Sequence, residues 1–387
     1  AVTGTPSLTT NNNTREITAA LSKTNSAAAC TVTNEKLARV TIVKQSNGGT
    51  GSFNFSGGTN GLPASLTLDT TTDNPKKSAT YRVVANNTAT ALTETIPADW
   101  TLNTTSTTCT DGSTTFGTLS GGTLIIPAVK VTPGNNITCT FVNDKNANIT
   151  VNKSLLPSGD NGKFNLLVGA TIVATNVGNS GTGSTTIPPN TAITVSETAG
   201  TATSLANYNA TYSCSGGYSV TNGSGSTISI PAGSVTPGST TICTFTNSRK
   251  PALTKAFSPA TISEGETSTL TFTLTNIAGN PAQPALAFTD TLVSGSGLTV
   301  TGVTALTGAN CSNTMPTFNA TSNPSVTLTG ASMSAGASVC TFTATVLGNT
   351  AGTYANTNAA NISGTSAGLD TSGVNSTLSI ISLLPNL

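Results

Sequence analysis

Histidine is absent from this sequence of 387 residues. Its absence removes the commonest general base, the base of most catalytic triads and the commonest metal ligand. Charged residues make up only 7% of the chain, whereas soluble globular domains usually contain about 25%. The polar surface must therefore be built from threonine, serine, asparagine and glycine. We expect the protein to be no enzyme, and we expect neither a cofactor nor a metal site.

Strong charge, long apolar runs and clustered aromatic residues are lacking as well. The net charge is +1, and no run of lysine or arginine occurs, so neither nucleic acid nor an anionic membrane surface is an expected partner. No apolar stretch approaches the roughly 20 residues that span a bilayer. Aromatic residues make up 4% of the chain and are scattered, which disfavours a ligand-binding tip.

Cysteine is present in a regular pattern. Three pairs have nearly the same spacing: Cys109 and Cys139, Cys214 and Cys243, Cys311 and Cys340. The clustered Cys-x-x-Cys ligands of a metal site do not occur, so we predict one disulfide for each pair. Closing a loop of about 30 residues stabilises a domain by roughly 3 to 4 kcal/mol and requires an oxidising compartment.

The cysteines belong to an internal repeat. The segment IIPAVKVTPGNNITCTFVNDKNANITVNK, residues 125–153, aligns without gaps with SIPAGSVTPGSTTICTFTNSRKPALTK further along the chain, and ITAALSKTNSAAACTVTNEKLARVTIVK fits the same frame. Equivalent positions are Cys30, Cys139 and Cys243; Ile17, Ile126 and Ile230; and Lys44, Lys153 and Lys255. One repeat ends and the next begins within this block.

The repeat sets the expected domain boundaries. We predict an incomplete half-repeat at 1–36, two similar domains at 37–145 and 146–249, and a different module at 250–387. The partner of Cys30 would fall just before residue 1. Cys30 is therefore unpaired, separated from its partner, or completed by another chain.

The secondary structure pattern is almost entirely β. Short alternating runs such as RVTIVK, TAITVSE and STLTFTLTN are separated by GG, NG and PG breakers. No stretch has helical periodicity. This pattern predicts tandem β-sandwich domains, immunoglobulin-like or prealbumin-like, joined by very short linkers into an elongated rod.

A few charged residues share a strand face with core residues. Lys44 alternates in phase with Val40 and Ile42, and Lys153 does so with Ile149 and Val151. The same phase places asparagines and glutamates on apolar faces of other strands: Asn143, Asn247, Glu94 and Glu197. Burying a lone charge costs several kcal/mol, so these groups require a common explanation.

A buried Lys, Glu and Asn can react with one another. Burial lowers the pKa of the amine and raises the pKa of the acid. The neutral amine can then attack the Asn side-chain carbonyl while the protonated Glu moves protons, and ammonia leaves. The product is an intramolecular isopeptide bond. In the alternative interpretation, Lys44 and Lys153 extend to solvent at strand ends, and Glu and Asn occupy turns.

These segments resemble the CnaB-type, prealbumin-like (SpaA-like pilin) domains of bacterial surface proteins. In that family an early Lys bonds to a late Asn, assisted by a Glu in a box of the kind E-T-x-x-P-x-x-aromatic. The first copy has Lys44, Glu94 with Pro97 and Trp100, and Asn143; the second has Lys153, Glu197 and Asn247. The second copy reads SETAGTATSLANY and lacks the proline of the box.

Residues 251–387 resemble the immunoglobulin-like conserved-repeat domains of bacterial surface proteins, through ALTKAFSPATISEGETSTLTFTLTN, LAFTDTL, CTFTATV and GTYANT. By analogy with CnaA-like sandwiches, Lys255, Asp290 and Asn356 are candidates for a third cross-link. A lysine at a strand end with Asp and Asn in turns is an equally good interpretation, and Asn276 is a rival partner. Sequons such as that at Asn361 arise by chance in a chain so rich in Asn and Thr.

The expected function is that of a structural subunit of an extracellular filament or stalk on a bacterial cell surface, with no membrane span in this chain. Its expected partner is a second copy of itself or another surface-protein domain, since the half-repeat invites strand addition. The alternative is a fragment of an adhesin stalk or ligand-binding surface protein.

Overall fold

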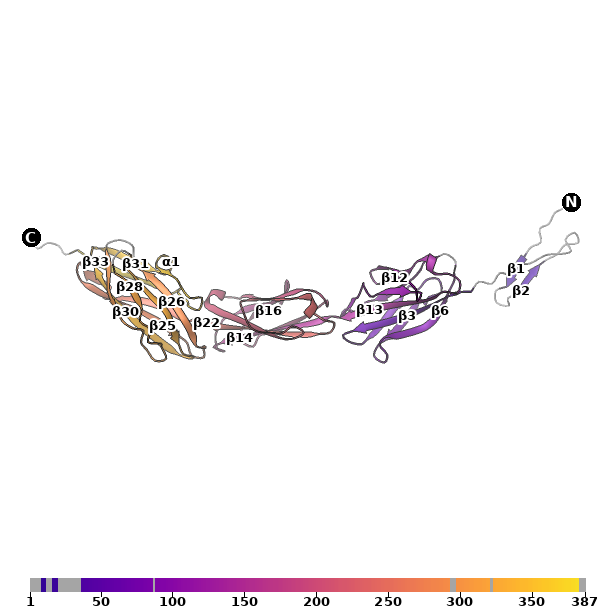
Figure 1. Ribbon diagram of the computed structural model, residues 1–387, viewed down its shortest axis with the longest axis horizontal. Helices are drawn as coiled ribbons and strands as arrows, with labels where there is room; N and C mark the ends of the chain where they lie inside the picture. The colour runs from indigo at the N-terminus through magenta and orange to yellow at the C-terminus, as the bar shows by residue number, and fades with distance from the viewer. Residues whose placement is uncertain are drawn as a thin grey trace, which may run out of the picture. The chain divides into compact units, whose positions relative to one another are not determined.

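The computed structural model describes residues 8–11, 16–19, 36–85, 88–292, 297–320 and 323–382. These residues fold almost entirely into strands, which form a hairpin and three β-sandwiches (Figure 1). Contacts divide the chain into two compact units. The first unit holds most of the first sandwich, and the second unit holds the other two.

The N-terminal hairpin pairs β1 (Leu8–Asn11) with β2 (Glu16–Ala19) in antiparallel register, with Leu8 opposite Ala19. The two strand-like stretches of the expected half-repeat therefore pair with each other. Cys30 lies outside the described residues.

The first sandwich has two facing sheets. One has the order β10-β9-β13-β3-β6, and β8 also pairs with β13. Its strands are β3 (Ala38–Asn47), β6 (Lys76–Val83), β8 (Trp100–Leu102), β9 (Thr108–Thr110), β10 (Thr115–Phe116) and β13 (Asn136–Lys145). The other has the order β11-β12-β7-β4-β5. Its strands are β4 (Ser52–Ser56), β5 (Ser65–Asp69), β7 (Thr90–Thr95), β11 (Thr118–Ser120) and β12 (Thr123–Ile126), followed by the 3-10 turn η1 (Ala128–Lys130).

The second sandwich repeats this plan. Its larger sheet has the order β17-β14-β22-β19-β20 and the smaller one β16-β15-β18-β21. The larger sheet consists of β14 (Ala147–Leu156), β17 (Thr182–Ile187), β19 (Tyr208–Gly216), β20 (Val220–Ser224) and β22 (Thr240–Arg249). The smaller one consists of β15 (Phe164–Val168), β16 (Thr171–Val177), β18 (Ile193–Ala199) and β21 (Thr227–Ile230), and the 3-10 turns are η2 (Leu205–Asn207) and η3 (Ala232–Ser234). The first strand, β14, lies parallel to the last strand, β22.

The third sandwich is built differently, from three sheets with the orders β23-β25-β30-β27, β24-β33-β31 and β28-β29-β26-β32. The first contains β23 (Ala252–Ser258), β25 (Thr267–Asn276), β27 (Leu298–Val303) and β30 (Ser338–Gly348). The second contains β24 (Thr261–Ser263), β31 (Gly352–Thr357) and β33 (Asn375–Ile381). The third contains β26 (Gln283–Thr291), β28 (Thr317–Asn319), β29 (Ser325–Met333) and β32 (Ile362–Ser363), and the short helix α1 spans Asn358–Asn361.

Alternating side chains fill the cores. In β3 the alternate residues Val40 and Ile42 lie on one face of the strand and are buried. In the same sandwich the ring of Phe55 meets that of Phe141 edge-on, with the ring centroids 5.0 Å apart. In the third sandwich Phe272 stacks on Phe342 at 4.6 Å. The period of two that predicted strands therefore also determines which side chains are buried.

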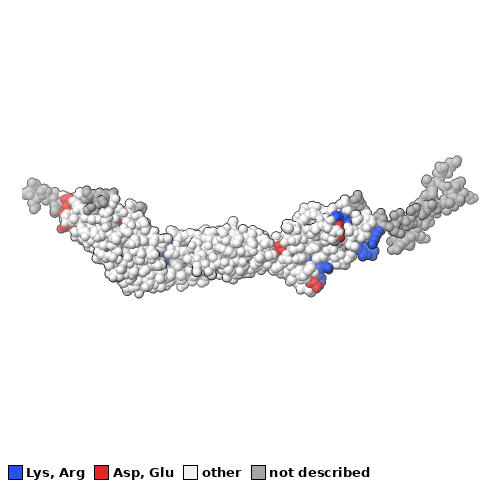
Figure 2. Space-filling view, viewed as in Figure 1, with Lys and Arg blue, Asp and Glu red and all other residues white. Residues whose placement is uncertain are grey.

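The surface is sparse in charge. On the face that Figure 2 shows, most of the surface of the described residues is white, so it is neither acidic nor basic, as expected from a charged fraction of 7%. Among the residues that the structure describes, no helix has both the length and the apolar character needed to cross a membrane.

The predicted all-β fold of tandem sandwiches is confirmed. The expectation of no helix missed the single turn α1 and the three 3-10 turns, which are too short to have a periodicity of their own. The boundaries at 37–145, 146–249 and 250–387 stay a prediction.

Candidate self-modification sites

The first sandwich buries a lysine. Lys44 is fully buried on β3, with its Nζ 3.1 Å from Oε1 of Glu94 on β7. The Nζ also donates to the backbone carbonyl oxygen of Phe141 at 3.3 Å and lies 4.4 Å from the centroid of the Phe53 ring. Lys44 therefore does not extend to solvent, and the strand-end interpretation is wrong for this residue.

The predicted partner, Asn143, is also fully buried, and it follows Phe141 by two positions along β13. Glu94 lies on β7, the central strand of the sheet β11-β12-β7-β4-β5, opposite Phe55 on β4. Its backbone N–H donates to the carbonyl oxygen of Gly122 at 2.8 Å. A Cβ on Gly122 would lie 2.3 Å from the Glu94 carbonyl oxygen. Glycine is therefore required where the chain passes the glutamate.

The end of the glutamate box forms a turn. The Trp100 backbone N–H donates to the carbonyl oxygen of Pro97 at 3.0 Å, and the Trp100 ring is nearly buried. Nζ of Lys145 lies 5.4 Å from the ring centroid. Pro97 and Trp100 thus shape the loop that follows the glutamate strand.

The second sandwich repeats the lysine environment. Nζ of Lys153 is 2.9 Å from Oε2 of Glu197, donates to the carbonyl oxygen of Phe245 at 3.3 Å, and lies 4.4 Å from the Phe164 ring centroid. Burial lowers the pKa of Lys153, and the charge and hydrogen bond of Glu197 oppose that shift. The missing box proline therefore leaves the lysine and glutamate pair unchanged.

Asn247 completes this second group. In the parallel pairing of β14 with β22, Lys153 lies opposite Phe245 and Leu155 opposite Asn247, so Asn247 is the diagonal neighbour of the lysine on one face. Asn247 is fully buried, and neither its Oδ1 nor its Nδ2 has a hydrogen-bond partner among the described residues. Each such unsatisfied group costs about 1 to 3 kcal/mol.

The third sandwich brings Lys255, Asp290 and Asn356 into mutual contact. Nζ of Lys255 is 2.8 Å from Oδ2 of Asp290 and donates to Oδ1 of Asn356. Nδ2 of Asn356 donates to the same Asp290 oxygen at 3.2 Å. The rival partner Asn276 instead donates to the carbonyl oxygens of Pro281 and Ser334, in a separate polar cluster.

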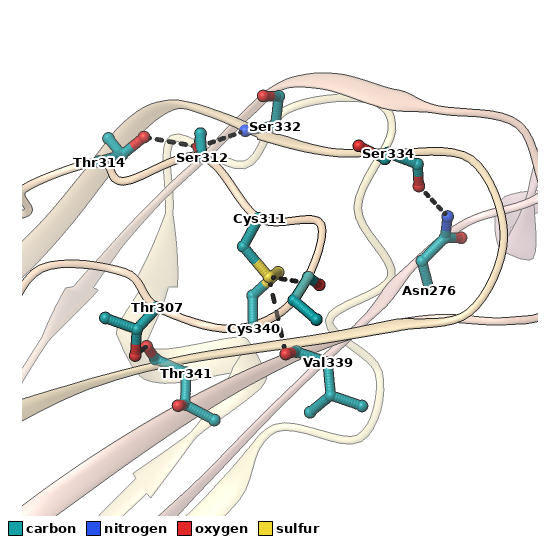
Figure 3. Close-up of a disulfide and its surroundings, with 11 residues drawn as sticks. Asn276, Thr307, Cys311, Ser312, Thr314, Ser332, Ser334, Val339, Cys340 and Thr341 are labelled. Atoms are coloured by element: carbon teal, nitrogen blue, oxygen red, sulfur yellow. Dashed lines mark hydrogen bonds between the residues drawn. A yellow bond between two sulfur atoms is a disulfide. The ribbon is translucent and has the colours of Figure 1, made fainter.

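The structure joins all three predicted cysteine pairs by disulfides, at S–S distances of 1.98, 2.05 and 1.87 Å. Two of them connect residues that lie directly opposite each other on neighbouring strands: Cys109 and Cys139, and Cys214 and Cys243. The third ties a loop to β30, as Figure 3 shows. Around it, Thr307 donates to the Thr341 carbonyl oxygen at 3.3 Å, and the Ser332 backbone N–H donates to the Ser312 hydroxyl at 2.9 Å.

Three parts of these sites were missed from the sequence. The rings of Phe53 and Phe164 cover the two lysines, although the matching pentapeptides GSFNF and GKFNL after each lysine strand carried a signal. Asn361, considered only as a chance sequon, is nearly buried. Its Oδ1 accepts from the Thr357 backbone and its Nδ2 donates to the carbonyl oxygen of Thr291.

Family models match two of the sandwiches. Residues 40–145 match the SpaA_4 family of prealbumin-like fold domains. Residues 251–380 match DUF7933, a domain of unknown function. The first sandwich is therefore a prealbumin-like domain of the SpaA type, as the lysine, glutamate and asparagine pattern predicted. No curated protein matched the chain.

The solved structures that this chain matches include pilins. The major pilin subunit BcpA of Bacillus cereus is 13% identical over 62% of this chain and 69% of its own, with a TM-score of 0.34. A variant of the major pilin of Streptococcus pyogenes is 14% identical over 55% of this chain and 99% of its own, with a TM-score of 0.24. A non-cellulosomal cohesin of Archaeoglobus fulgidus is 14% identical over 34% of this chain and 91% of its own, with a TM-score of 0.24. At these scores the assignment rests on the family match and on the sheets themselves.

Proposed function

We propose that this chain is a structural subunit of an extracellular filament or stalk on a bacterial surface. Its two prealbumin-like sandwiches are closed by isopeptide bonds between Lys44 and Asn143 and between Lys153 and Asn247, and its third sandwich by a bond between Lys255 and Asn356. The prealbumin-like fold and the disulfides fit a surface pilus or stalk subunit.

The observation that carries the proposal is the amide of Asn247. It is fully buried without a hydrogen-bond partner among the described residues, next to a lysine already paired with a glutamate. An ordinary core would place an apolar residue there, since the buried amide is destabilising. As a reactant its position is explained, because bond formation removes the unpartnered amino group as ammonia.

The reaction needs no group beyond these three. A proton passes from Nζ of Lys153 to Glu197, the neutral Nζ attacks Cγ of Asn247, and a C–N bond forms. Glu197 passes this proton to Nδ2 and takes the second proton of Nζ, the bond between Cγ and Nδ2 breaks, and ammonia leaves. Glu197 ends protonated, so the three side chains have no net charge before or after the reaction, and nothing is oxidised or reduced.

The position of the bond suits a load-bearing subunit. Lys153 lies on the first strand and Asn247 on the last strand of the second sandwich, and these strands are parallel neighbours. A covalent bond between them carries tension from the strand that begins the sandwich directly to the strand that ends it. The remaining strands then lie outside the path of the force.

Peptide mapping of the reduced protein tests both bonds. We expect a branched peptide joining Lys153 to Asn247 and another joining Lys44 to Asn143, each lighter by one ammonia than the sum of its parts. Replacement Glu197→Ala should abolish the second bond alone. Asn165→Ala, at a partly exposed asparagine of the same sandwich, is the matched control and should leave both bonds intact. Unlinked peptides in the unaltered protein contradict the proposal.

Assembly is tested separately. We propose that subunits associate through strand addition at the N-terminal segment 1–36, so negative-stain microscopy should show long regular fibres. Deletion of 1–36 should leave only short particles. Fibres that persist after the deletion rule out this segment as the connector. Short particles from the intact chain would instead favour an adhesin stalk.

A further inference from the structure

Two of the four arginines in the sequence face each other on the first sandwich. Arg39 on β3 lies directly opposite Arg82 on β6, and both residues are exposed. The backbone N–H of Arg39 donates to the carbonyl oxygen of Asn135, next to β13 and on the side of β3 away from β6. Arg39 and Arg82 therefore form a non-hydrogen-bonded pair, in which the Cα atoms are about 4.5 Å apart and the side chains are closest.

No described acid neutralises this pair. Like charges directly opposite each other on neighbouring strands destabilise a sheet. Among the described residues, neither Arg39 nor Arg82 forms an ion pair, and the acids Asp73 and Asp111 pair with lysines elsewhere in the sandwich. Two repelling guanidinium groups are thus held side by side in a chain that has few charges. An anion between them would convert the repulsion into attraction.

Lys36 adds a third cation. Lys36, Leu37, Arg39 and Arg82 line a surface hollow of about 300 Å³. The carbonyl oxygen of Lys36 accepts from the backbone N–H of Gly134 at 3.0 Å, and a Cβ on Gly134 would lie 3.0 Å from Cδ of Lys36. The apolar stem of Lys36 therefore packs against Gly134. Three cations without a described acidic partner line one hollow.

The backbone around the arginine pair is fixed by its neighbours. A Cβ on Gly61 would lie 2.5 Å from the carbonyl oxygen of Arg82, so only glycine lets the chain pass there. The next pair on the same two strands is Thr41 and Thr80, whose hydroxyl oxygens are hydrogen-bonded at 3.1 Å. These contacts set the spacing of the two arginines before a ligand binds, which lowers the entropic cost of binding.

We propose that Lys36, Arg39 and Arg82 bind a phosphate group of a phosphodiester-linked polyol polymer on the cell surface. A guanidinium group presents N–H donors in a planar fork that fits phosphate oxygens, and such charged hydrogen bonds are stronger than neutral ones. The phosphate also brings negative charge between the two repelling groups. The phosphate site depends only on these residues, whereas the source of the phosphate rests on the proposed function.

Phosphate fits these three cations better than a carboxylate does. The two oxygens of a carboxylate lie in one plane, and a single arginine fork occupies both. The oxygens of a phosphate are arranged tetrahedrally around phosphorus, so they accept hydrogen bonds from donors in several directions. Arg39 and Arg82 approach from neighbouring strands, and Lys36 approaches from the segment that precedes β3.

The place of the site in the sheet suits a long ligand. Arg82 lies on β6, an edge strand in the order β10-β9-β13-β3-β6, so a polymer can continue past the hollow along the sheet edge. One site with three cations binds weakly. A filament that repeats the site binds many phosphates of one polymer, which raises the overall affinity without new contacts in each subunit.

Titration calorimetry of the full-length chain with synthetic poly(glycerol phosphate) in phosphate-free buffer is the direct test. Arg39→Gln and Arg82→Gln should each lower the affinity about tenfold or more, because each removes hydrogen bonds to a charged group. Lys77→Gln removes the same charge at an exposed lysine of β6 and should bind as the unaltered chain does. Absence of binding, or an equal loss in Lys77→Gln, overturns the proposal.

Two further ligands separate phosphate recognition from general attraction between charges. Polygalacturonate carries only carboxylates and should bind about tenfold more weakly than poly(glycerol phosphate). Equal affinity for the two polymers rejects the phosphate site. Tighter binding of a single-stranded oligonucleotide would assign the site to nucleic acid and would also overturn the proposal. The double variant Arg39→Lys, Arg82→Lys keeps both charges without the forks, and normal affinity in it rejects the role of the forks.

Unfolding in urea, followed by the fluorescence of Trp100, gives a second readout. In phosphate-free buffer Arg82→Gln should raise the urea midpoint of the first sandwich, because it removes the like charge opposite Arg39. Inorganic phosphate should raise the midpoint of the unaltered chain more than that of the variant. An equal response of both proteins shows a general effect of the ion and contradicts the site.

Failure of this inference is distinct from failure of the proposed function. Peptide mapping scores the isopeptide bonds and microscopy scores the fibres, and neither depends on added phosphate. Bonds and fibres without binding of poly(glycerol phosphate) would overturn the phosphate site alone. Binding without fibres would leave the site in place and contradict the filament.

Discussion

At the scale of single residues, the most informative feature is that polar groups occupy core positions. Lys44, Lys153 and Lys255 each share a strand face with aliphatic neighbours, and each meets a buried acid at about hydrogen-bond distance. Taking two charges out of water costs several kcal/mol per ion, and their attraction offsets that cost only in part. The proposed isopeptide bonds would remove both charges, which would account for the arrangement in all three sandwiches.

The first residue-scale prediction concerns Glu94. Replacement Glu94→Ala should prevent the bond from Lys44 and leave its charge uncompensated in the core, which lowers the free energy of unfolding of the first sandwich by about 3 to 5 kcal/mol. The chain has one tryptophan, Trp100, so its fluorescence during urea unfolding is the measurement. Asp73→Ala breaks an exposed ion pair with Lys76 and should cost less than about 1 kcal/mol. Equal effects of the two replacements would contradict the account.

The second concerns pH and the Asp290→Ala variant, in which Lys255 stays unlinked. Burial holds the native pKa of Lys255 below its ordinary value of 10.5. Between these two values the unfolded chain binds a proton that the native state lacks, so the free energy of unfolding rises with pH through this window. Chemical unfolding at several pH values measures the slope. Adding Lys255→Met should remove it, and a slope that persists would assign the effect to another group.

At the scale of strands, the sequence predicted which side chains are buried within a strand better than it predicted contacts between distant segments. Alternation is a local property, so it correctly predicted that Cys139, Phe141 and Asn143 all face the core. It could not show that Phe53 covers Lys44 or that Asn361 bridges two strands, since these contacts depend on how distant segments pack. For the same reason Asn276 remained a rival until the third sandwich showed it in another cluster.

One element-scale prediction concerns the disulfide that holds the loop before β28 against β30. Joint replacement of Cys311 and Cys340 by alanine should lower the free energy of unfolding of the third sandwich by about 3 kcal/mol, because a loop of about 30 residues is released in the unfolded chain. Hydrogen exchange of peptides from this sandwich is the measurement. Thr307→Val removes only an exposed hydrogen bond beside the disulfide and should cost about 1 kcal/mol or less. Unchanged exchange in the double variant would contradict the stabilising role.

At the scale of the whole molecule, each sandwich combines a disulfide with a lysine site, on a surface that is nearly free of charge. Such a chain resists unfolding through covalent bonds more than through surface ion pairs. In the proposed assembly, association with other copies would depend on backbone pairing and apolar contact, because a net charge of +1 supplies little long-range attraction or repulsion.

Salt should therefore affect assembly weakly. Between roughly 0.05 and 0.5 M salt, the screening length falls several-fold, yet we expect fibre yield, measured by sedimentation, to stay nearly constant. A steep loss of fibres with salt would show that charged contacts hold the subunits together.

The central claim is that the three sandwiches are closed covalently by their own side chains. The most direct measurement is the intact mass of the fully reduced, denatured chain. The account predicts a mass below the sequence value by three molecules of ammonia, and by one fewer in each of the variants Glu94→Ala, Glu197→Ala and Asp290→Ala after correction for the substituted residue. A mass equal to the sequence value would contradict it.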